Sequence, residues 1–200
     1  MLASDLHIHL DGSLRPKTLV ELSRRAGVIP RTLSDEAFTE RLRFRPGMSL
    51  TSCLARFEAT TGLMQDRGTI SRVASELVHD CYRDGTRHME VRFCPQLHTR
   101  RGLGPREALE AALDGLERGR AEALSGSPDD LMSAGLIVTL LQGMKREDAR
   151  TLVLLALESA GSGVLGVDIA GDEALFDAPR LRDLMAEARS AGLGVTVHAG

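Results

Sequence analysis

The sequence predicts an α/β fold in which parallel strands alternate with helices. Short apolar runs alternate with amphipathic stretches of helical period along the 200 residues, which is the pattern of βα units. The run AGLIVTLL at 134–141 is apolar on both faces, as expected for a sheet that helices cover. No internal repeat or low-complexity linker interrupts this pattern. We therefore expect a single domain over residues 1–200.

Five segments have the length and composition of strands. In HMEVRF, for example, Met89, Val91 and Phe93 alternate with polar neighbours, which is the two-residue period of a strand. The predicted strands are Leu6–Leu10, His88–Phe93, Ala134–Leu141, Val164–Ala170 and Gly194–His198.

Seven segments are predicted as helices, and three of them start with a proline, which favours the first turn of a helix. They are Pro16–Ala26, Ser34–Arg41, Ser49–Leu63, Ile70–Arg83, Pro105–Leu124, Glu147–Ser159 and Pro179–Ala191. The first four form a helical insertion at about 11–87, between the first two strands. An insertion of this length is too large for a plain connection, so we expect it to cover part of the fold.

Charge and composition argue against several classes of protein. A net charge of −3 disfavours nucleic acid as a partner, because phosphate binding needs a basic surface. No apolar run approaches the roughly 20 residues that span a bilayer, and the N-terminus lacks the basic start and apolar middle of a signal peptide. Three widely spaced cysteines without a Cys-x-x-Cys pair are typical of a reduced protein. We expect a cytoplasmic protein with no membrane partner.

The strongest chemical signal is HIHLDG at 7–12. Side chains two residues apart on a strand point the same way, so His7 and His9 can share one metal ion at the C-terminal end of the first strand. Zinc is the usual ion for nitrogen ligands. Asp11 follows at the same parity, where the chain leaves the strand. The alternative is two structural histidines that happen to alternate.

A second signal is VTVH at 195–198, an alternating strand that ends in a histidine. The active site of a barrel lies at the C-terminal ends of its strands, so His198 is in the right place to be a third ligand. Taken alone, this pattern is more often a strand-end histidine that faces solvent.

A third signal is GVDIAGDE at the end of the fourth predicted strand. Gly171 allows close backbone approach to a ligand, and Asp168, Asp172 and Glu173 would put carboxylates at the same rim. The commoner meaning of such a string is a turn into a helix with capping acids.

The number of strands leaves two architectures open. Five strands can complete a doubly wound sheet, whereas a (β/α)8 barrel needs eight strands and typically ~250 residues. If the fold is a barrel, the sequence is truncated after about the fifth strand.

In order and spacing, HIHLDGSL, EVRFCP, GVDIAGDE and VTVHAG resemble the adenosine deaminase family of metal-dependent hydrolases in the amidohydrolase superfamily. The resemblance runs across the whole chain, which matches the N-terminal part of a family member. It implies a (β/α)8 TIM barrel with the metal in its C-terminal mouth. It also implies zinc-dependent hydrolytic deamination of adenosine or deoxyadenosine to inosine or deoxyinosine and ammonia.

The resemblance also implies roles for individual residues. His7, His9 and His198 would bind one zinc ion, His9 and Asp11 would face a purine nucleoside, and the backbone at Gly171 would contact the purine ring. The family's acid glutamate, a later histidine and an aspartate pair would all lie beyond the last residue of this sequence. One aspartate of that pair would be the fourth ligand. We therefore expect no catalytic acid within residues 1–200, and negligible turnover by these residues alone.

Two departures from the family pattern bear on the identity of the substrate. Gln142 follows the third strand where relatives often carry an arginine, and Phe57 is the single aromatic residue of the predicted helix at 49–63. The alternatives are a deaminase of adenine or of a modified adenosine, a metal phosphoesterase, and a catalytically incomplete barrel fragment. A phosphoesterase would be expected to show more basic residues at the strand ends.

Overall fold

A computed structural model describes residues 3–30, 32–127, 129–175 and 178–198, and its centre is one parallel sheet. Neighbouring strands in the sheet are also neighbours along the chain. The strands are β1 (Ala3–His9), β2 (Thr86–Phe93), β3 (Ser133–Leu141), β4 (Val164–Ala170) and β5 (Gly194–Val197). All five predicted strands are therefore present, and all five are parallel.

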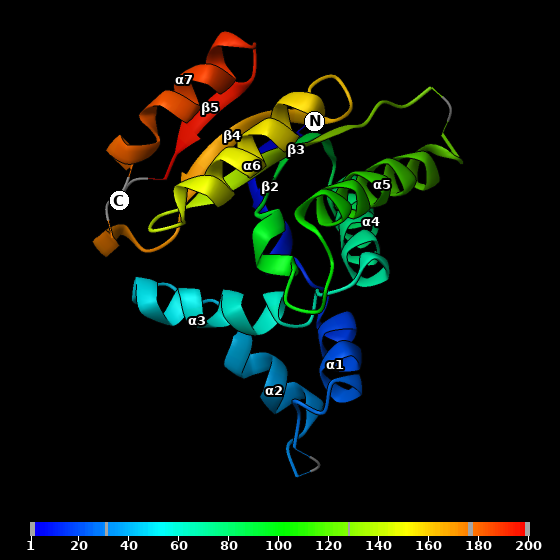
Figure 1. Ribbon diagram of the computed structural model, residues 1–200. Coiled ribbons are helices and arrows are strands. Elements are labelled where there is room, and N and C mark those ends of the chain that lie inside the picture. Colours follow the sequence, from blue (N-terminus) through cyan, green and yellow to red (C-terminus); the bar gives the residue numbers. More distant parts are fainter. Residues whose placement is uncertain (1–2, 31, 128, 176–177, 199–200) are drawn as a thin grey trace.

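The helices fall into two groups (Figure 1). Helices α4 to α7 lie along one side of the sheet, whereas α1 to α3 form a separate group beyond the end of the strands. The α-helices are α1 (Pro16–Arg25), α2 (Asp35–Leu42), α3 (Leu50–Thr61), α4 (Arg67–Arg83), α5 (Pro105–Leu124), α6 (Arg146–Glu158) and α7 (Arg182–Ser190). Short 3-10 helices span Leu10–Gly12, Pro95–His98, Glu173–Leu175 and Ala178–Leu181.

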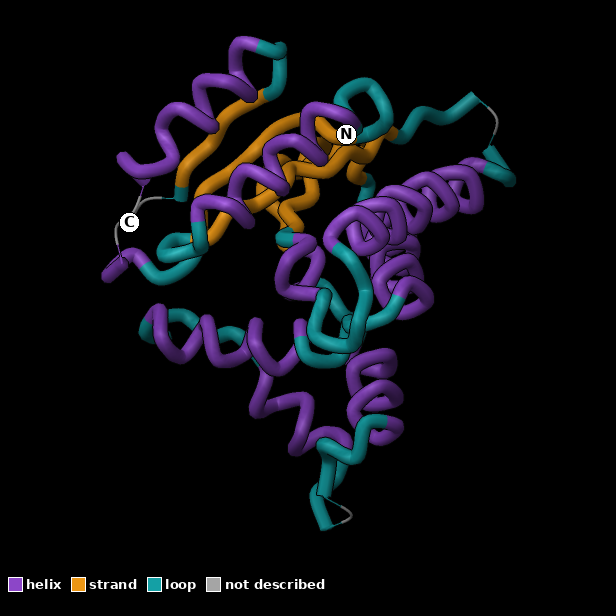
Figure 2. Tube along the Cα trace, viewed as in Figure 1, coloured by secondary structure: helices purple, strands orange, loops and turns teal. Residues whose placement is uncertain are grey.

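The strand order decides between the two architectures that the sequence leaves open. A doubly wound sheet reverses its strand order and carries helices on both faces. Here the order is sequential, and the helices that contact β2 to β5 cover one face, which leaves the other face to curl inward (Figure 2). The five strands thus form half of a (β/α)8 barrel.

The main core lies between the outer face of this curled sheet and helices α4 to α7. Val91, Val138 and Val167, from three adjacent strands, are fully buried there. Because side chains alternate along a strand, the residues between them point to the inner face. This alternation is what delivers polar side chains to the inside of the curled sheet. No helix among the described residues is long and apolar enough to cross a membrane.

The structure moves several predicted boundaries. The first strand spans Ala3–His9 rather than Leu6–Leu10, and three further changes are accompanied by a specific hydrogen bond. β5 ends at Val197, although the backbone N–H of His198 still donates to the carbonyl of Ile169 at 2.8 Å. The final helix does not start at Pro179, because the carbonyl of Arg180 accepts a hydrogen bond from the Arg146 guanidinium and a 3-10 turn precedes α7.

The third of these changes concerns α4, which starts at Arg67 rather than at Ile70. The Asp66 side chain caps this helix by accepting from the backbone N–H of Thr69 at 2.9 Å.

Helices α4 and α5 pack so closely that a side chain would not fit at their crossing. A Cβ atom built at Gly115 would meet the carbonyl oxygen of Ser71, and would lie 2.8 Å from its Cα and 2.7 Å from the Cβ of Ala74. Since two of these atoms belong to the α4 backbone, the helices would have to separate. Gly119, one turn further along α5, is placed against Ser75 in the same way.

Gly115→Ala is therefore expected to destabilise the fold by about 1–3 kcal/mol, because overpacking outweighs the better helix propensity of alanine. Gly126→Ala is the matched control, since a Cβ there meets nothing within 4 Å. Urea denaturation of both variants measures the difference. If the two variants were equally stable, the close contact of α4 and α5 at Gly115 would not contribute to the stability of the fold.

Candidate metal centre and pocket

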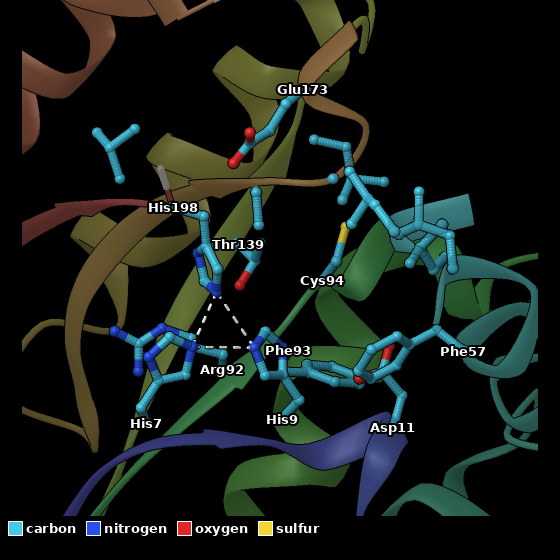
Figure 3. A pocket seen from close by; sticks show the side chains of 17 residues that line it. His7, His9, Asp11, Phe57, Arg92, Phe93, Cys94, Thr139, Glu173 and His198 are labelled. Atoms are coloured by element: carbon cyan, nitrogen blue, oxygen red, sulfur yellow. Dashed lines mark hydrogen bonds between the residues drawn. The ribbon is translucent and has the colours of Figure 1, made fainter. Parts of the chain in front are cut away.

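Three imidazoles converge at the C-terminal ends of the two edge strands. The Nε2 atom of His7 lies 3.2 Å from that of His9 and 2.9 Å from that of His198, and the third separation is 3.2 Å (Figure 3). His7 and His198 are 191 positions apart in the chain. The structure thus brings together the three histidines that the sequence motifs singled out. Ala199 and Gly200 of the same motif lie outside the described residues.

This convergence depends on the curl of the sheet. β1 and β5 are its two edges, with three strands between them. Neighbouring strands lie about 4.8 Å apart, so the edges of a flat sheet of this order would be about 19 Å apart. The contact between His7 and His198 therefore exists because the strand ends turn toward a common axis.

The chemistry of the three nitrogens favours a cation at their centre. A neutral imidazole carries one N–H, and a ring protonated on Nδ1 presents only a lone pair at Nε2. Three converging lone pairs repel each other unless a positive charge lies among them. Burial and the neighbouring imidazoles lower the pKa of His9 to about 4, and burial and Arg92 lower the pKa of His7. The rings of His7 and His9 are therefore neutral at pH 7, as metal ligands must be.

The spacing of the nitrogens also fits a metal ion. Zn–N bonds of ~2.0–2.1 Å in tetrahedral geometry place two nitrogens ~3.3 Å apart, close to the separations observed here. Among the described residues, these three histidines are the group of side chains whose ligand atoms are close enough to hold one ion.

A buried carboxylate contacts His198 on the side of the ring that faces away from His7 and His9. Nδ1 of His198 lies 2.7 Å from Oδ2 of Asp168, whose side chain is completely buried. The expectation that Asp168 lies at the rim with Asp172 and Glu173 is therefore wrong. Asp168 belongs to the inner face of β4, because its position in the strand alternates with the outward-facing Val167.

A cavity of about 440 Å³ opens beside the three histidines. This volume is in the range of small-molecule sites. Leu50, Leu54 and Phe57 of α3 form one wall, and the ends of the strands form the floor. The Phe57 ring packs against His9 with 5.5 Å between ring centroids. Helix α3, part of the segment between the first two strands, thus lines the cavity.

Asp11 lines this cavity from the turn that follows β1. Its side chain is buried, and Oδ2 accepts a hydrogen bond of 3.3 Å from the Thr61 hydroxyl. Burial raises the pKa of Asp11 to about 6. A carboxyl group that is buried in this way has lost its hydrogen bonds to water. It can form a hydrogen bond with a hydroxyl group of a ligand instead.

Gly171 and Glu173 follow β4 and line the cavity, and Glu173 lies on the side away from Asp11 (Figure 3). Gly171 has φ +107°, a conformation that favours glycine, and it has no side chain of its own to cover its backbone where it lines the cavity. Glu173 directs its carboxylate toward the histidines in Figure 3.

Two polar residues of the cavity floor escape the sequence analysis. Arg92 on β2 and Thr139 on β3 are both buried and line the cavity. The signal for Arg92 is present in the sequence, since it occupies a polar position in a strand whose apolar residues pack outward. The periodicity does not show that Arg92 lies next to Asp168, because Asp168 is 76 positions further along the chain.

The comparison with protein families gives one match over nearly the whole chain. The family model described as adenosine deaminase matches residues 3–200. Adenosine deaminase 1 of Streptomyces coelicolor is 36% identical over 199 residues, which cover 98% of this chain and 49% of that protein. The chain therefore spans about half the length of this relative.

Two solved structures have the same fold. Arabidopsis ADAL complexed with GMP matches with a TM-score of 0.82 and 25% identity, over 100% of this chain and 58% of that one. Adenine deaminase from Arthrobacter aurescens matches with a TM-score of 0.76 and 26% identity, over 98% and 57% of the two chains.

We expect the protein to bind one zinc ion through the three imidazoles. His198→Ala should weaken zinc binding by about 100-fold or more, because a ligand is lost outright. His79→Ala is the matched control, since this imidazole of α4 pairs with Glu122 of α5 and does not line the cavity. Competition with a chromophoric chelator measures both affinities. Equal weakening in the two variants would argue against the site.

Proposed function

We propose, because this chain belongs to the adenosine deaminase family, that the protein it forms is a zinc-dependent aminohydrolase of purine nucleosides. The reaction is hydrolytic removal of the 6-amino group from adenosine or deoxyadenosine, which yields inosine or deoxyinosine and ammonia. The observation that carries this proposal is the convergence of His7, His9 and His198 beside a cavity of nucleoside size. Such a reaction would serve purine salvage, and a cytoplasmic location remains our prediction.

The three histidines would hold the zinc ion through their Nε2 atoms. A zinc ion bound there supplies a Lewis acid that activates water at neutral pH. The neutral state of His7 and His9 keeps their lone pairs available for this task. The apolar wall of α3 excludes bulk water from the same side of the cavity, which strengthens electrostatic interactions within it.

The remaining predicted site residues would bind the substrate. His9 would face it beside the metal, and Asp11 would bind a ribose hydroxyl, since its buried carboxyl has a single side-chain partner in Thr61 among the hydrogen bonds of the described residues. The backbone of Gly171 would contact the purine ring, because glycine leaves the peptide accessible from the cavity.

The charges of the cavity favour an unphosphorylated substrate. Among the described residues, Arg92 is the single lysine or arginine that lines it. Its guanidinium already donates to the carbonyl of Leu6 and lies 3.4 Å from Asp168. The two carboxylate side chains of the lining, Asp11 and Glu173, would repel a phosphate. A nucleoside therefore fits this lining better than a nucleotide, in contrast to the GMP bound by ADAL.

Adenine and modified adenosines remain the second candidates. The structural likeness to an adenine deaminase supports the first of them. Gln142, in place of an arginine, lines a smaller cavity that shares Leu54 and Phe57 with the first one, and it supports a change in substrate. The same deamination chemistry would apply to each.

An assay of ammonia release from a panel of purines tests the proposal with the complete protein. Adenosine or deoxyadenosine should be turned over with a kcat/KM about 100-fold or more above that of AMP. The reason is that the phosphate of AMP would be buried next to carboxylates without a cation to pair with it. Adenine and N6-substituted adenosines complete the panel. Activity confined to phosphate esters would contradict the proposal.

If Asp11 binds the ribose, its substitution should affect KM more than kcat. Asp11→Asn should raise the KM for adenosine about tenfold and change kcat less, because the ribose hydroxyl does not react. Asp84→Asn, at the far end of α4, is the control with the same change of charge. Steady-state kinetics of both variants give the answer, and a large loss of kcat at unchanged KM would assign Asp11 to the chemical step instead.

A further inference from the structure

A buried ionic network lies directly behind the three histidines. Its centre is the Asp168 carboxylate, which has no exposed surface. Oδ1 accepts a hydrogen bond of 2.8 Å from the Thr196 hydroxyl, and Oδ2 lies 2.7 Å from Nδ1 of His198. Nε of Arg92 lies 3.4 Å from the same Oδ2. Three side chains, from β2, β5 and the residue after β5, thus meet around this one carboxylate of β4.

The carboxylate acts on His198 through the nitrogen that faces away from the metal centre. A negative charge 2.7 Å from Nδ1 favours the tautomer with its proton on Nδ1. In that tautomer Nε2 carries a lone pair, and this is the atom that lies 2.9 Å from His7 and 3.2 Å from His9. Because Thr196 holds the other carboxylate oxygen, Asp168 has little freedom to turn away.

Arg92 connects the same carboxylate to the opposite edge of the sheet. Its Nη1 donates a hydrogen bond of 2.6 Å to the carbonyl of Leu6, the residue before His7. Arg92 is 6% exposed, and its guanidinium is a permanent cation beside the fully buried carboxylate of Asp168. One side chain therefore touches both the strand that carries His7 and His9 and the carboxylate that faces His198.

We propose that Asp168 and Arg92 are positioning residues of the metal centre. Asp168 sets the tautomer and orientation of His198, and Arg92 holds β1 at the distance from β4 that lets the three Nε2 atoms converge. Neither residue is one of the three proposed ligands. The proposal rests on the proposed metal role of His7, His9 and His198.

Asp168→Asn tests the first half of this proposal. The amide has the shape of the carboxylate but lacks the charge that stabilises the proton on Nδ1. Zinc affinity, measured by chelator competition with the complete protein, should fall about 10- to 100-fold. In the zinc-free protein, the nitrogen NMR signals of His198 should show a larger fraction of the tautomer protonated on Nε2.

Asp130→Asn is the matched control, because its carboxylate accepts hydrogen bonds from Arg87 and Tyr82 at a distance from the cavity. Both variants should lower Tm, but zinc affinity should change only in Asp168→Asn. Thr196→Val is a milder second variant that should weaken zinc binding by about two- to fivefold, in the same direction, because it frees Asp168 to turn.

Arg92 is tested by two substitutions that differ in charge. Arg92→Met should weaken zinc binding more than Arg92→Lys, since lysine keeps a cation beside Asp168. Wild-type zinc affinity together with the wild-type tautomer in Asp168→Asn would overturn the proposal, while leaving the metal site standing. Failure of the wild-type protein to bind zinc would instead overturn the metal site and this proposal with it.

Discussion

The curl of the sheet is the constraint on which the site depends. Two motifs nearly 200 positions apart lie on opposite edges of a five-stranded sheet, and they meet because the strand ends turn toward one axis. Helices on the outer face make this possible, since they leave the inner face free to close. The three imidazoles and the Phe57 side chain of α3 lie next to each other (Figure 3), and all of them line the cavity.

The two faces of the sheet have opposite chemistry for this reason. Outward-facing valines pack against the helices and form a dry core, whereas the inner face carries Arg92, Thr139, Asp168 and Thr196. A buried ion pair adds little net stability, but removal of one partner typically costs about 3–5 kcal/mol. The inner polar layer is therefore better explained by the placement of the histidines than by the stability of the fold.

Local patterns predict much of this arrangement and miss its long-range part. The two-residue period correctly places His7 and His9 on one side of a strand, and the alternation of apolar runs with amphipathic stretches predicts the five strands and the seven α-helices, but not the short 3-10 helices. The same period cannot show that Asp168 is buried against Arg92 rather than exposed at a rim, because the two residues meet only across the closed interior. The start of α7 is missed for a similar reason, since a side chain from α6 holds the carbonyl of Arg180.

The central claim is that the imidazoles of residues 7, 9 and 198 bind a single ion. Anomalous diffraction at the zinc edge, from crystals of the complete zinc-loaded protein, tests it most directly. One strong peak within ~2.0–2.1 Å of the three Nε2 atoms is the predicted result. A zinc peak elsewhere, or one that contacts fewer than three of these rings, would contradict the account.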